Sequence, residues 1–373
     1  GKMTINFKAP EIRELKPRIL VLGVGGAGGN AINEMIESGV EGVEFIAVNT
    51  DAQDLKTSKA QTRIQIGLNI TKGLGAGAKH EIGQAAADES LNDIIDLLKG
   101  SNMVFITAGM GGGTGTGAAP VIASIAKELG ALTVAVVTKP FKFEGKKRIG
   151  AAEKGLAGLV EEVDSLVTIP NEKLLEILGP DTPIADAFAK SDDVLKGAVQ
   201  GISDIIMQRG HVNVDFADVK AVMSEKGTAM MGTGIATGKN RAEAAATMAV
   251  KSELLDDINL KNARGVLVNI TGKSPTLGDQ TEVTNIVEEI VSEDALVIYG
   301  LVFDDKYKDD LKVTIVATGV DQKAPSLVID NEPSMKLNPV GLDKDKTSQK
   351  VGTSSAEEID FLDVPTFMRK QVD

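Results

Sequence analysis

A glycine-rich stretch in the first third of the chain is its most specific motif, and its sequence is Gly109-Met110-Gly111-Gly112-Gly113-Thr114-Gly115-Thr116-Gly117-Ala118. It lies between a β-branched run that ends at Thr107 and a helical pattern that begins at Ala118. Glycine loses more backbone entropy than any other residue when it is ordered. Six glycines in nine residues before a helix therefore indicate a turn whose backbone amides wrap an anion, with Thr114 and Thr116 as hydroxyl donors.

Two more glycine segments follow predicted strands and precede predicted helices. Gly23–Asn30 contains the pattern G-x-G-x-x-G, in which glycines let backbone amides approach a phosphate. The third segment is Gly73–Gly77. Three such turns fit the three phosphates of a nucleoside triphosphate better than the single pyrophosphate of a dinucleotide. The Walker pattern is absent, because Leu267 stands where Gly272-Lys273-Ser274 would need an upstream glycine.

A nicotinamide-dependent dehydrogenase is the alternative at this point. The first glycine segment alone is shared with dinucleotide-binding enzymes, and Asp51 ends the next predicted strand, where it would bind the ribose of the cofactor. That function does not explain the glycine-rich stretch at Gly109–Gly117. A scaffold that does not hydrolyse nucleotide is a third possibility.

Short β-branched runs alternate with helical patterns in the first half of the chain. The runs that predict strands are Arg18–Leu22, Glu44–Asn49, Arg63–Ile66, Met103–Thr107, Thr133–Thr138 and Ser165–Ile169. The patterns that predict helices are Asn30–Ser38, Glu81–Leu98, Ala118–Leu129 and Lys146–Val163. Such alternation predicts an α/β fold with a mainly parallel sheet, and ligands bind such sheets beyond the carboxyl ends of the strands.

The second half begins with apolar residues at helical spacing over Asp186–Arg209, which predict one long helix. After it, Thr228–Thr233, Gly265–Thr271, Ala295–Phe303 and Lys312–Thr318 predict strands, and Arg241–Leu255 and Thr281–Ser292 predict helices. The predicted organisation is an extension at 1–17, a Rossmann-like domain at 18–185, a central helix at 186–210, a smaller α/β domain at 211–320, a polar flexible linker at 321–358 and a docking peptide at 359–373.

Composition excludes several classes of protein. The 373 residues carry a formal net charge of −13, the wrong sign for neutralising nucleic-acid phosphates. The absence of Cys removes disulfides, cysteine-based zinc sites and thiol nucleophiles, and His80 and His211 are the two histidines. Residues 100–126 carry no charge but are too rich in glycine and threonine to span a membrane. No leader segment is evident, and we expect a cytoplasmic protein without membrane insertion.

Three motifs, in order along the chain, resemble those of the FtsZ family of bacterial tubulin-like cell-division GTPases. Gly109–Gly117 is similar to the tubulin signature loop, Asn213–Val219 to the synergy loop, and Asp363–Gln371 to the C-terminal recognition peptide. The resemblance covers almost the whole chain. It implies a GTPase that binds GTP or GDP with Mg²⁺, polymerises head to tail into protofilaments of the division ring at midcell, and binds membrane-tethering and regulatory division proteins through Asp363–Gln371.

The resemblance also implies roles for individual residues, carried over by position. The phosphates would be surrounded by Gly25, Gly26, Gly75, Ala76, Gly77, Gly112, Gly113, Thr114, Gly115 and Thr116. Glu144 and Arg148 fall where the family contacts ribose and phosphate, and Asn30, Asn171, Phe188 and Asp192 where it holds sugar and guanine. Catalysis would be performed on the next subunit's nucleotide by Asn213, Asp215 and Asp218. No protein-only metal site is expected.

Elementary chemistry agrees with these roles but leaves alternatives. Phe188 offers a stacking face, and an Asp carboxylate can accept hydrogen bonds from guanine N1–H and the 2-amino group. Asp193 follows Asp192 directly, so either carboxylate could contact the base. Phe188 can instead pack in the core beneath the long helix. Asp215 and Asp218 can instead cap a helix, because carboxylates favour helix N-termini.

Overall fold

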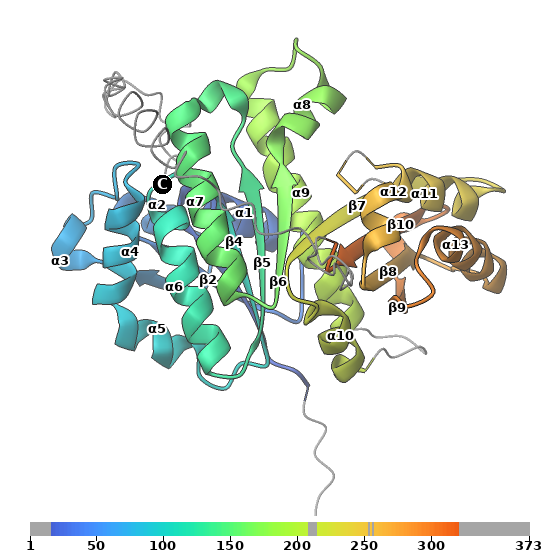
Figure 1. The fold of residues 1–373 in the computed structure, drawn as a ribbon, viewed down its shortest axis with the longest axis horizontal. Helices are drawn as coiled ribbons and strands as arrows, with labels where there is room; N and C mark the ends of the chain where they lie inside the picture. Colours follow the sequence, from blue (N-terminus) through green and yellow to red (C-terminus); the bar gives the residue numbers. More distant parts are fainter. Residues whose placement is uncertain (1–15, 208–214, 253, 256, 321–373) are drawn as a thin grey trace, which may run out of the picture.

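The computed structural model describes residues 16–207, 215–252, 254–255 and 257–320. Within these residues, ten strands form one sheet in the order β3-β2-β1-β4-β5-β6-β7-β10-β8-β9 (Figure 1). The strands are β1 (Ile19–Val24), β2 (Glu44–Asn49), β3 (Thr62–Gln65), β4 (Met103–Gly109), β5 (Leu132–Lys139), β6 (Ser165–Pro170), β7 (Thr228–Ala236), β8 (Gly265–Gly272), β9 (Leu296–Phe303) and β10 (Leu311–Thr318). The pairs from β3 to β6 are all parallel, which confirms the predicted α/β fold.

Helices alternate with the strands along the chain. They are α1 (Gly25–Glu37), α2 (Ala52–Thr57), α3 (Leu68–Thr71), α4 (His80–Glu89), α5 (Leu91–Leu98), α6 (Thr114–Glu128), α7 (Lys146–Glu162), α8 (Asn171–Leu178), α9 (Ile184–Ile206), α10 (Phe216–Met223), α11 (Arg241–Val250), α12 (Asp257–Asn262) and α13 (Leu277–Ile290). Short 3₁₀ helices are η1 (Lys142–Glu144) and η2 (Asp305–Tyr307). None of the helices in the described part of the chain could cross a membrane.

Alternate residues of each parallel strand enter two different cores, because successive side chains point to opposite faces of a sheet. In β1, Ile19 and Val21 pack with residues of α1, α9 and α10, whereas Leu20 and Leu22 pack with residues of α4 to α7. A third core lies between the C-terminal strands and helices α11 and α13. The parallel sheet is therefore buried on both faces, and its carboxyl edge is left for ligands.

Helices α4 and α6 approach each other closely at Gly117. A Cβ atom on Gly117 would lie 1.9 Å from the His80 carbonyl oxygen, a distance that real Cβ atoms do not show. Gly117 therefore permits a backbone contact between the first turn of α6 and the first residue of α4, which follows the third glycine segment.

Strand β7 joins the two halves of the sheet. It pairs with β6 in parallel through two residue pairs, Leu166 with Thr228 and Val167 with Ala229. It pairs with β10 in antiparallel fashion through seven. The C-terminal domain is thus connected to the first domain by a short ladder and by α9, which packs against both halves.

Every predicted strand is present, with its ends shifted by at most three residues. The prediction of one helix over Glu81–Leu98 was wrong, because α4 and α5 are separated at Ser90. Ser90 lies between the two helices with a φ of −99° and a ψ of 20°, and its hydroxyl accepts a hydrogen bond from the Gly67 amide at 3.1 Å. The helix predicted to begin at Asn30 begins at Gly25, so glycines of the first segment are helical.

The long helix runs from Ile184 to Ile206 and so confirms the prediction of a central helix. The helix predicted over Arg241–Leu255 ends at Val250. The one predicted from Thr281 begins at Leu277, where Thr276 and Asp279 form a capping box. The predicted linker 321–358, the peptide 359–373 and most of the extension 1–17 lie outside the described residues.

Candidate functional site

The three glycine segments meet at the carboxyl edge of the parallel sheet. A Cβ atom on Gly115 would lie 3.3 Å from the Val24 carbonyl oxygen, so the start of α6 contacts the end of β1. A Cβ atom on Gly113 would lie 2.7 Å from the Ala76 Cβ and 3.2 Å from the Ala78 amide nitrogen. Side chains at these positions would push the three backbone segments apart. The glycines therefore place many backbone amides around one small region.

The central turn is held by hydrogen bonds between its own residues. Gly111 has a φ of 110°, which favours glycine, and its amide donates to the Thr116 hydroxyl at 2.8 Å. The Met110 amide donates to the Thr138 carbonyl oxygen at 3.0 Å, which ties the turn to β5. Thr114 and the residues after it are already helical, so the amides of the first helical turn have no partner within the helix.

A polar segment at the end of β2 adds Asn49 and Thr50, which the sequence reasoning missed. Asn49 accepts hydrogen bonds from the amides of Thr50 and Asp51 at 2.8 and 3.2 Å. The Asp51 side chain caps α2 by accepting from the Gln53 and Asp54 amides. Asp51 is the residue that would bind ribose in the dehydrogenase alternative. In the structure its carboxylate caps α2 instead. The signal that could have found this segment is its run of three polar residues directly after a buried strand.

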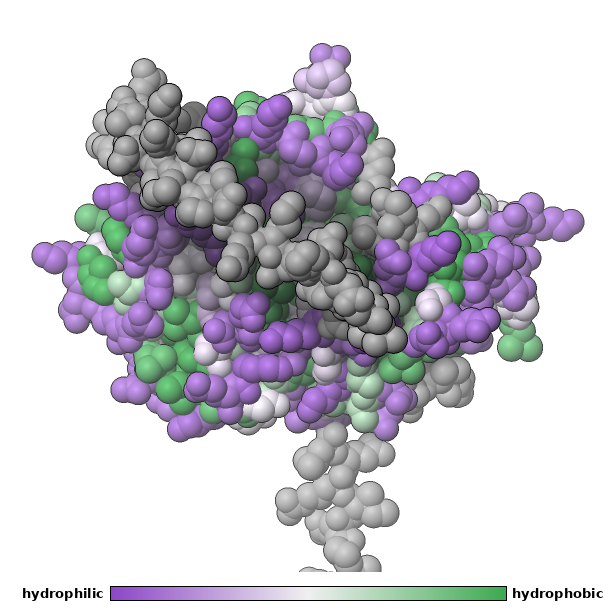
Figure 2. All heavy atoms as spheres, in the orientation of Figure 1, coloured by the Kyte–Doolittle hydropathy of each residue, from purple (hydrophilic) through white to green (hydrophobic). Residues whose placement is uncertain are grey.

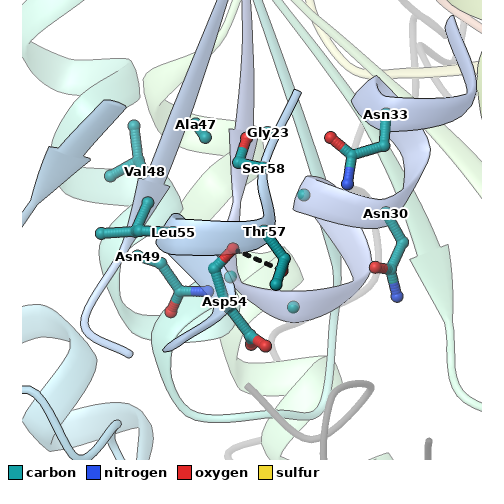
Figure 3. Close-up of a pocket in the computed structure, with 13 residues that line it drawn as sticks. Gly23, Asn30, Asn33, Ala47, Val48, Asn49, Asp54, Leu55, Thr57 and Ser58 are labelled. Atoms are coloured by element: carbon teal, nitrogen blue, oxygen red, sulfur yellow. Dashed lines mark hydrogen bonds between the residues drawn. The ribbon is translucent and has the colours of Figure 1, made fainter. Parts of the chain in front are cut away.

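A pocket lies beside the first glycine segment, between α1, β2 and α2 (Figure 3). Its polar lining side chains include the amides of Asn30, Asn33 and Asn49 and the carboxylate of Asp54. Gly25 and Gly26 complete its wall at the start of α1. Of the predicted site residues, the pocket contains Asn30 and these two glycines, whereas Asn33 and Asp54 were not predicted.

An aromatic cluster joins the η1 segment to the start of α9. Phe188 in α9 meets Phe141 edge-on, with ring centroids 5.3 Å apart, and Phe143 edge-on at 5.9 Å. Phe188 is buried, as the core-packing alternative predicted, while Phe143 is half exposed. Asn171 at the start of α8 accepts a hydrogen bond from the Ser191 hydroxyl at 2.8 Å. The predicted sugar and guanine residues of α8 and α9 are therefore neighbours.

Glu144 and Arg148 form a partly buried pair next to this cluster. Glu144 Oε2 accepts from the Phe141 amide at 2.7 Å, and Glu144 Oε1 lies 3.7 Å from an Arg148 guanidinium nitrogen. Burial raises the pKa of Glu144 despite the hydrogen bond and the nearby cation. Burial also lowers the pKa of Arg148. Both side chains would gain from a polar ligand that replaces the lost water.

The two neighbouring carboxylates of α9 differ in their surroundings. Burial raises the pKa of Asp192 well above its ordinary value, and the negative charge of Glu34 raises it further. Asp193 instead lies 3.1 Å from the Lys196 Nζ and 3.6 Å from the Lys190 Nζ, in the half-exposed surface of the helix. Asp192 is thus the more deeply buried of the two carboxyls.

Asp215 and Asp218 lie far from the glycine turns of the same chain. Asp215 caps α10 by accepting from the Ala217 amide at 3.1 Å, which is the capping role weighed above, and Asp218 lies in the first turn. Figure 1 shows α10 at the lower end of α9 and α8 at the upper end. From Phe188 to Ile206, α9 extends about 27 Å at 1.5 Å per residue. Asn213 lies outside the described residues.

Two family models match the chain. The first describes the GTPase domain of the Tubulin/FtsZ family and matches residues 18–179, which include all three glycine segments. The second describes the C-terminal domain of the FtsZ family and matches residues 227–321. The chain belongs to the FtsZ family. Membership assigns to it a tubulin-like GTPase domain, GTPase activity and a part in cell division.

Curated relatives support FtsZ membership over nearly the whole chain. The cell division protein FtsZ of Pseudomonas aeruginosa is 52% identical over 381 residues, which cover 95% of this chain and 97% of the relative. That of Coxiella burnetii is 50% identical over 366 residues, which cover 98% of this chain and 92% of the relative.

Solved structures agree with the FtsZ fold. The empty FtsZ dimer of M. jannaschii is 46% identical, covers 83% of this chain and 90% of its own, and superposes with a TM-score of 0.79. The GTPγS-bound protofilament of CetZ2 from Haloferax volcanii is 21% identical, with a TM-score of 0.69 over 90% of this chain and all of its own. At that identity, the second likeness shows the fold alone.

Proposed function

We propose that this FtsZ-family chain assembles head to tail and hydrolyses the GTP of one subunit with carboxylates of the next. The observation that carries the proposal is the separation of Asp215 and Asp218 from the glycine turns along α9. A general base must lie about 3 Å from the proton that it abstracts, or one water further. An acidic pair at the opposite end of the molecule meets this condition only when a second subunit contributes it.

The glycine turns supply the phosphate half of the site in this proposal. The groups that would surround the phosphates belong to Gly25, Gly26, Gly75, Ala76, Gly77, Gly112, Gly113, Thr114, Gly115 and Thr116. Backbone amides and the N-termini of α1 and α6 favour anions there. Glu144 and Arg148 would contact ribose and phosphate, and Asn30, Asn171, Phe188 and Asp192 would hold the sugar and guanine.

Mg²⁺ fits a site of this kind. It usually keeps several waters and takes phosphate oxygens together with one or two protein ligands. The described residues contain no group of three or more acidic or histidine side chains that could hold an ion alone. The Thr114 and Thr116 hydroxyls are protein oxygens at the central glycine turn that would assist the substrate phosphates. The ion would neutralise phosphate charge, while Asp215 and Asp218 would orient water and accept its proton.

An exposed apolar patch next to the third glycine segment supports assembly at this end of the molecule. It consists of Leu68, Ile70 and Leu74, of which Leu74 is 79% exposed. Figure 2 shows hydrophobic surface over α3 at the left edge of the molecule. Exposed apolar patches commonly mark interfaces. A second subunit that brings its α10 to the glycine turns would cover this patch.

Dilution tests catalysis between subunits. Specific GTPase activity should fall towards zero at low protein concentration and rise above a threshold at which pelleting also begins. Asp215→Ala should retain GTP binding and pelleting but lose about 10²–10⁴ in turnover, as expected for a lost acid–base group. Specific activity that does not change on dilution would show that one chain contains the complete site.

Mixing two inactive variants makes the test sharper. A subunit with Asp215→Ala keeps an intact nucleotide site, whereas one with Gly113→Val keeps an intact acidic loop but cannot close its glycine turn around Ala76. Their mixture should recover part of the activity if each active site is shared between subunits. A mixture as inactive as its components, while both still co-pellet, would contradict the proposal.

The proposed cellular role is the division ring at midcell, with Asp363–Gln371 as the contact for membrane-tethering and regulatory division proteins. These residues lie outside the described part of the chain, and the proposal rests on their sequence, in which apolar residues return after a polar linker. Deleting 359–373 should leave GTP hydrolysis and pelleting unchanged while abolishing recruitment to a membrane tether. Loss of filaments on deletion would instead assign the peptide to assembly.

A further inference from the structure

Three phenylalanine rings pack together at the residue proposed to stack on guanine. Phe141 and Phe143 are stacked, with ring centroids 5.0 Å apart and an angle of 10° between their planes. Phe188 is nearly perpendicular to both, with its centroid 5.3 Å from that of Phe141 and 5.9 Å from that of Phe143. Such separations are favourable for aromatic pairs. Phe188 therefore has two aromatic partners within its own chain.

The Phe188 ring has little surface left for a base. Phe188 is 7% exposed, and Leu175 and Ala187 pack in the same cluster as the rings. A base that stacks on a ring needs an open face, because the two planes lie about 3.5–4 Å apart and close-packed side chains leave no gap of that width. Guanine can thus stack on Phe188 only if a neighbouring ring moves.

Phe143 is the neighbouring ring that is free to move. Phe141 is fully buried, whereas Phe143 is 45% exposed. A buried side chain cannot change its rotamer without displacing its neighbours, whereas an exposed one changes its rotamer within picoseconds to nanoseconds. Rotation towards solvent would take the Phe143 ring away from Phe188 and leave Phe141 in place.

The backbone around Phe143 is held by hydrogen bonds on both sides. The Lys142 amide donates to the Glu172 carboxylate at the start of α8. The Glu144 amide donates to the Phe141 carbonyl oxygen at 3.0 Å, and the Glu144 carboxylate accepts from the Phe141 amide at 2.7 Å. The movement of Phe143 is therefore a rotation of its side chain and does not require the η1 segment to move.

We propose that the Phe143 ring competes with the base for Phe188 and thereby sets the affinity of the site for the nucleotide. The inference rests on the proposed function, in which Phe188 holds guanine. The apparent affinity of a site is its intrinsic affinity multiplied by the fraction of molecules that can accept the ligand. The contact between Phe143 and Phe188 lowers that fraction. One aromatic pair of this kind should weaken apparent binding about two- to tenfold.

Competition for Phe188 concerns the base and not the phosphates. A ligand that consists of phosphate alone should therefore bind equally well whether or not the Phe143 ring is present. Truncating Phe143 should strengthen the binding of a nucleotide, whereas truncating a side chain that supports the site or contacts the base would weaken it. The sign of the change thus distinguishes competition from a supporting role.

The first test titrates GDP and inorganic pyrophosphate into the full chain by calorimetry, at a protein concentration below that at which pelleting begins. Phe143→Ala should bind GDP about two- to tenfold more tightly than the wild type and pyrophosphate equally well. The matched control is Phe303→Ala in β9, because Phe303 is also 45% exposed. It should bind both ligands as the wild type does. Urea unfolding checks the fold, and Phe143→Ser replaces an alanine variant that does not fold.

The second test follows the position of the ring by fluorescence. The chain contains no tryptophan, so Phe143→Trp provides a single indole. On addition of GDP, its emission should shift to longer wavelength and its quenching by acrylamide should increase, because the ring leaves Phe188. Pyrophosphate should cause neither change. Phe303→Trp should respond to neither ligand.

The outcomes separate this inference from the proposed role of Phe188. Phe188→Leu retains apolar volume without a ring, and it should weaken GDP binding but not pyrophosphate binding. If it does so while Phe143→Ala binds GDP no more tightly than the wild type, Phe143 does not compete with the base and the inference is wrong. An indole of Phe143→Trp that becomes less accessible on addition of GDP would also overturn it. If Phe188→Leu binds GDP as the wild type does, the assignment of Phe188 to guanine fails instead.

Discussion

The hydroxyl oxygens of Thr50 and Thr114 lie 2.8 Å apart, and both residues are fully buried. Thr50 follows β2, and Thr114 is the first residue of α6. Either hydroxyl can donate to the other. The bond thus joins the polar segment after β2 to the helix N-terminus that the central glycine turn leads into, so these two parts of the proposed phosphate site cannot move independently.

Replacing Thr114 should weaken both stability and nucleotide binding. Thr114→Val keeps the shape of the side chain but leaves the Thr50 hydroxyl buried without a partner, which should cost about 1–3 kcal/mol in the free energy of unfolding. The control is Thr107→Val in β4, because the Thr107 hydroxyl is already buried without a hydrogen-bond partner among the described residues. Urea unfolding and GDP titration should show losses for the first variant alone. Equal effects in both would contradict the role of the Thr50–Thr114 bond.

A methyl group at Gly117 should separate α4 from α6. The added Cβ would lie 1.9 Å from the His80 carbonyl oxygen, so Gly117→Ala should lower the free energy of unfolding by about 1–3 kcal/mol or more. Gly150→Ala in α7 has open space around the new atom and should stabilise the helix by about 0.4–1 kcal/mol. Thermal denaturation of both variants checks the prediction, and a stable Gly117→Ala would refute the close contact.

Asp204 should make stability decrease as the pH rises through mildly acidic values. Burial raises the pKa of Asp204 to about 6, although Lys312 opposes the shift. The unfolded chain ionises this carboxyl at lower pH than the folded chain does. Stability from Asp204 is therefore full below about pH 4 and is lost by about pH 6, a change of about 3 kcal/mol.

Asp204→Asn should remove this pH dependence. Relative to the wild type, the unfolding free energy of the variant should improve between about pH 4 and about pH 6.5. Asp294→Asn removes an exposed carboxyl and controls for the change in net charge. Urea unfolding across this range provides the measurement. A constant difference between wild type and Asp204→Asn would contradict the prediction.

A charge in the apolar patch should prevent assembly without disturbing the nucleotide site. Leu68→Asp in α3 places a carboxylate where the proposed interface buries a side chain that is 58% exposed in the single chain. Pelleting and GTPase activity should both be lost, while GDP affinity and unfolding remain close to those of the wild type. Leu277→Asp, at an 86% exposed leucine in the C-terminal domain, should retain activity. Loss of assembly in both variants would point to a general effect of charge.

Local patterns predicted the framework of the site well. The β-branched runs and the glycine segments report on backbone preferences within a few residues, so the strands, the order of the elements and the three glycine turns at one sheet edge could be predicted. The position of Asp215 at a helix N-terminus was also foreseeable, because capping depends on adjacent residues.

Contacts between distant residues could not be predicted. The Ser90 hydroxyl binds the Gly67 amide between α4 and α5, and the helical periodicity of the sequence does not indicate that bond. Asn171 and Ser191 are brought together by the packing of α8 on α9, which the spacing within either helix does not reveal. The same holds for Thr50 and Thr114. Tertiary packing determines these relations, whereas propensity determines the elements.

In mechanical terms, β7 forms one short, weak ladder with β6 and one long, strong ladder with β10. Load carried across a sheet is shared among the hydrogen-bonded pairs of the ladder, and β7 has two pairs with β6 but seven with β10. A tensile force that draws the two halves of the sheet apart would therefore separate β6 from β7 first. The C-terminal strands would then be released as one intact unit. If such subunits polymerise as proposed above, tension along the polymer would load the β6–β7 ladder in every subunit, and α9 would remain as the tether between the two halves.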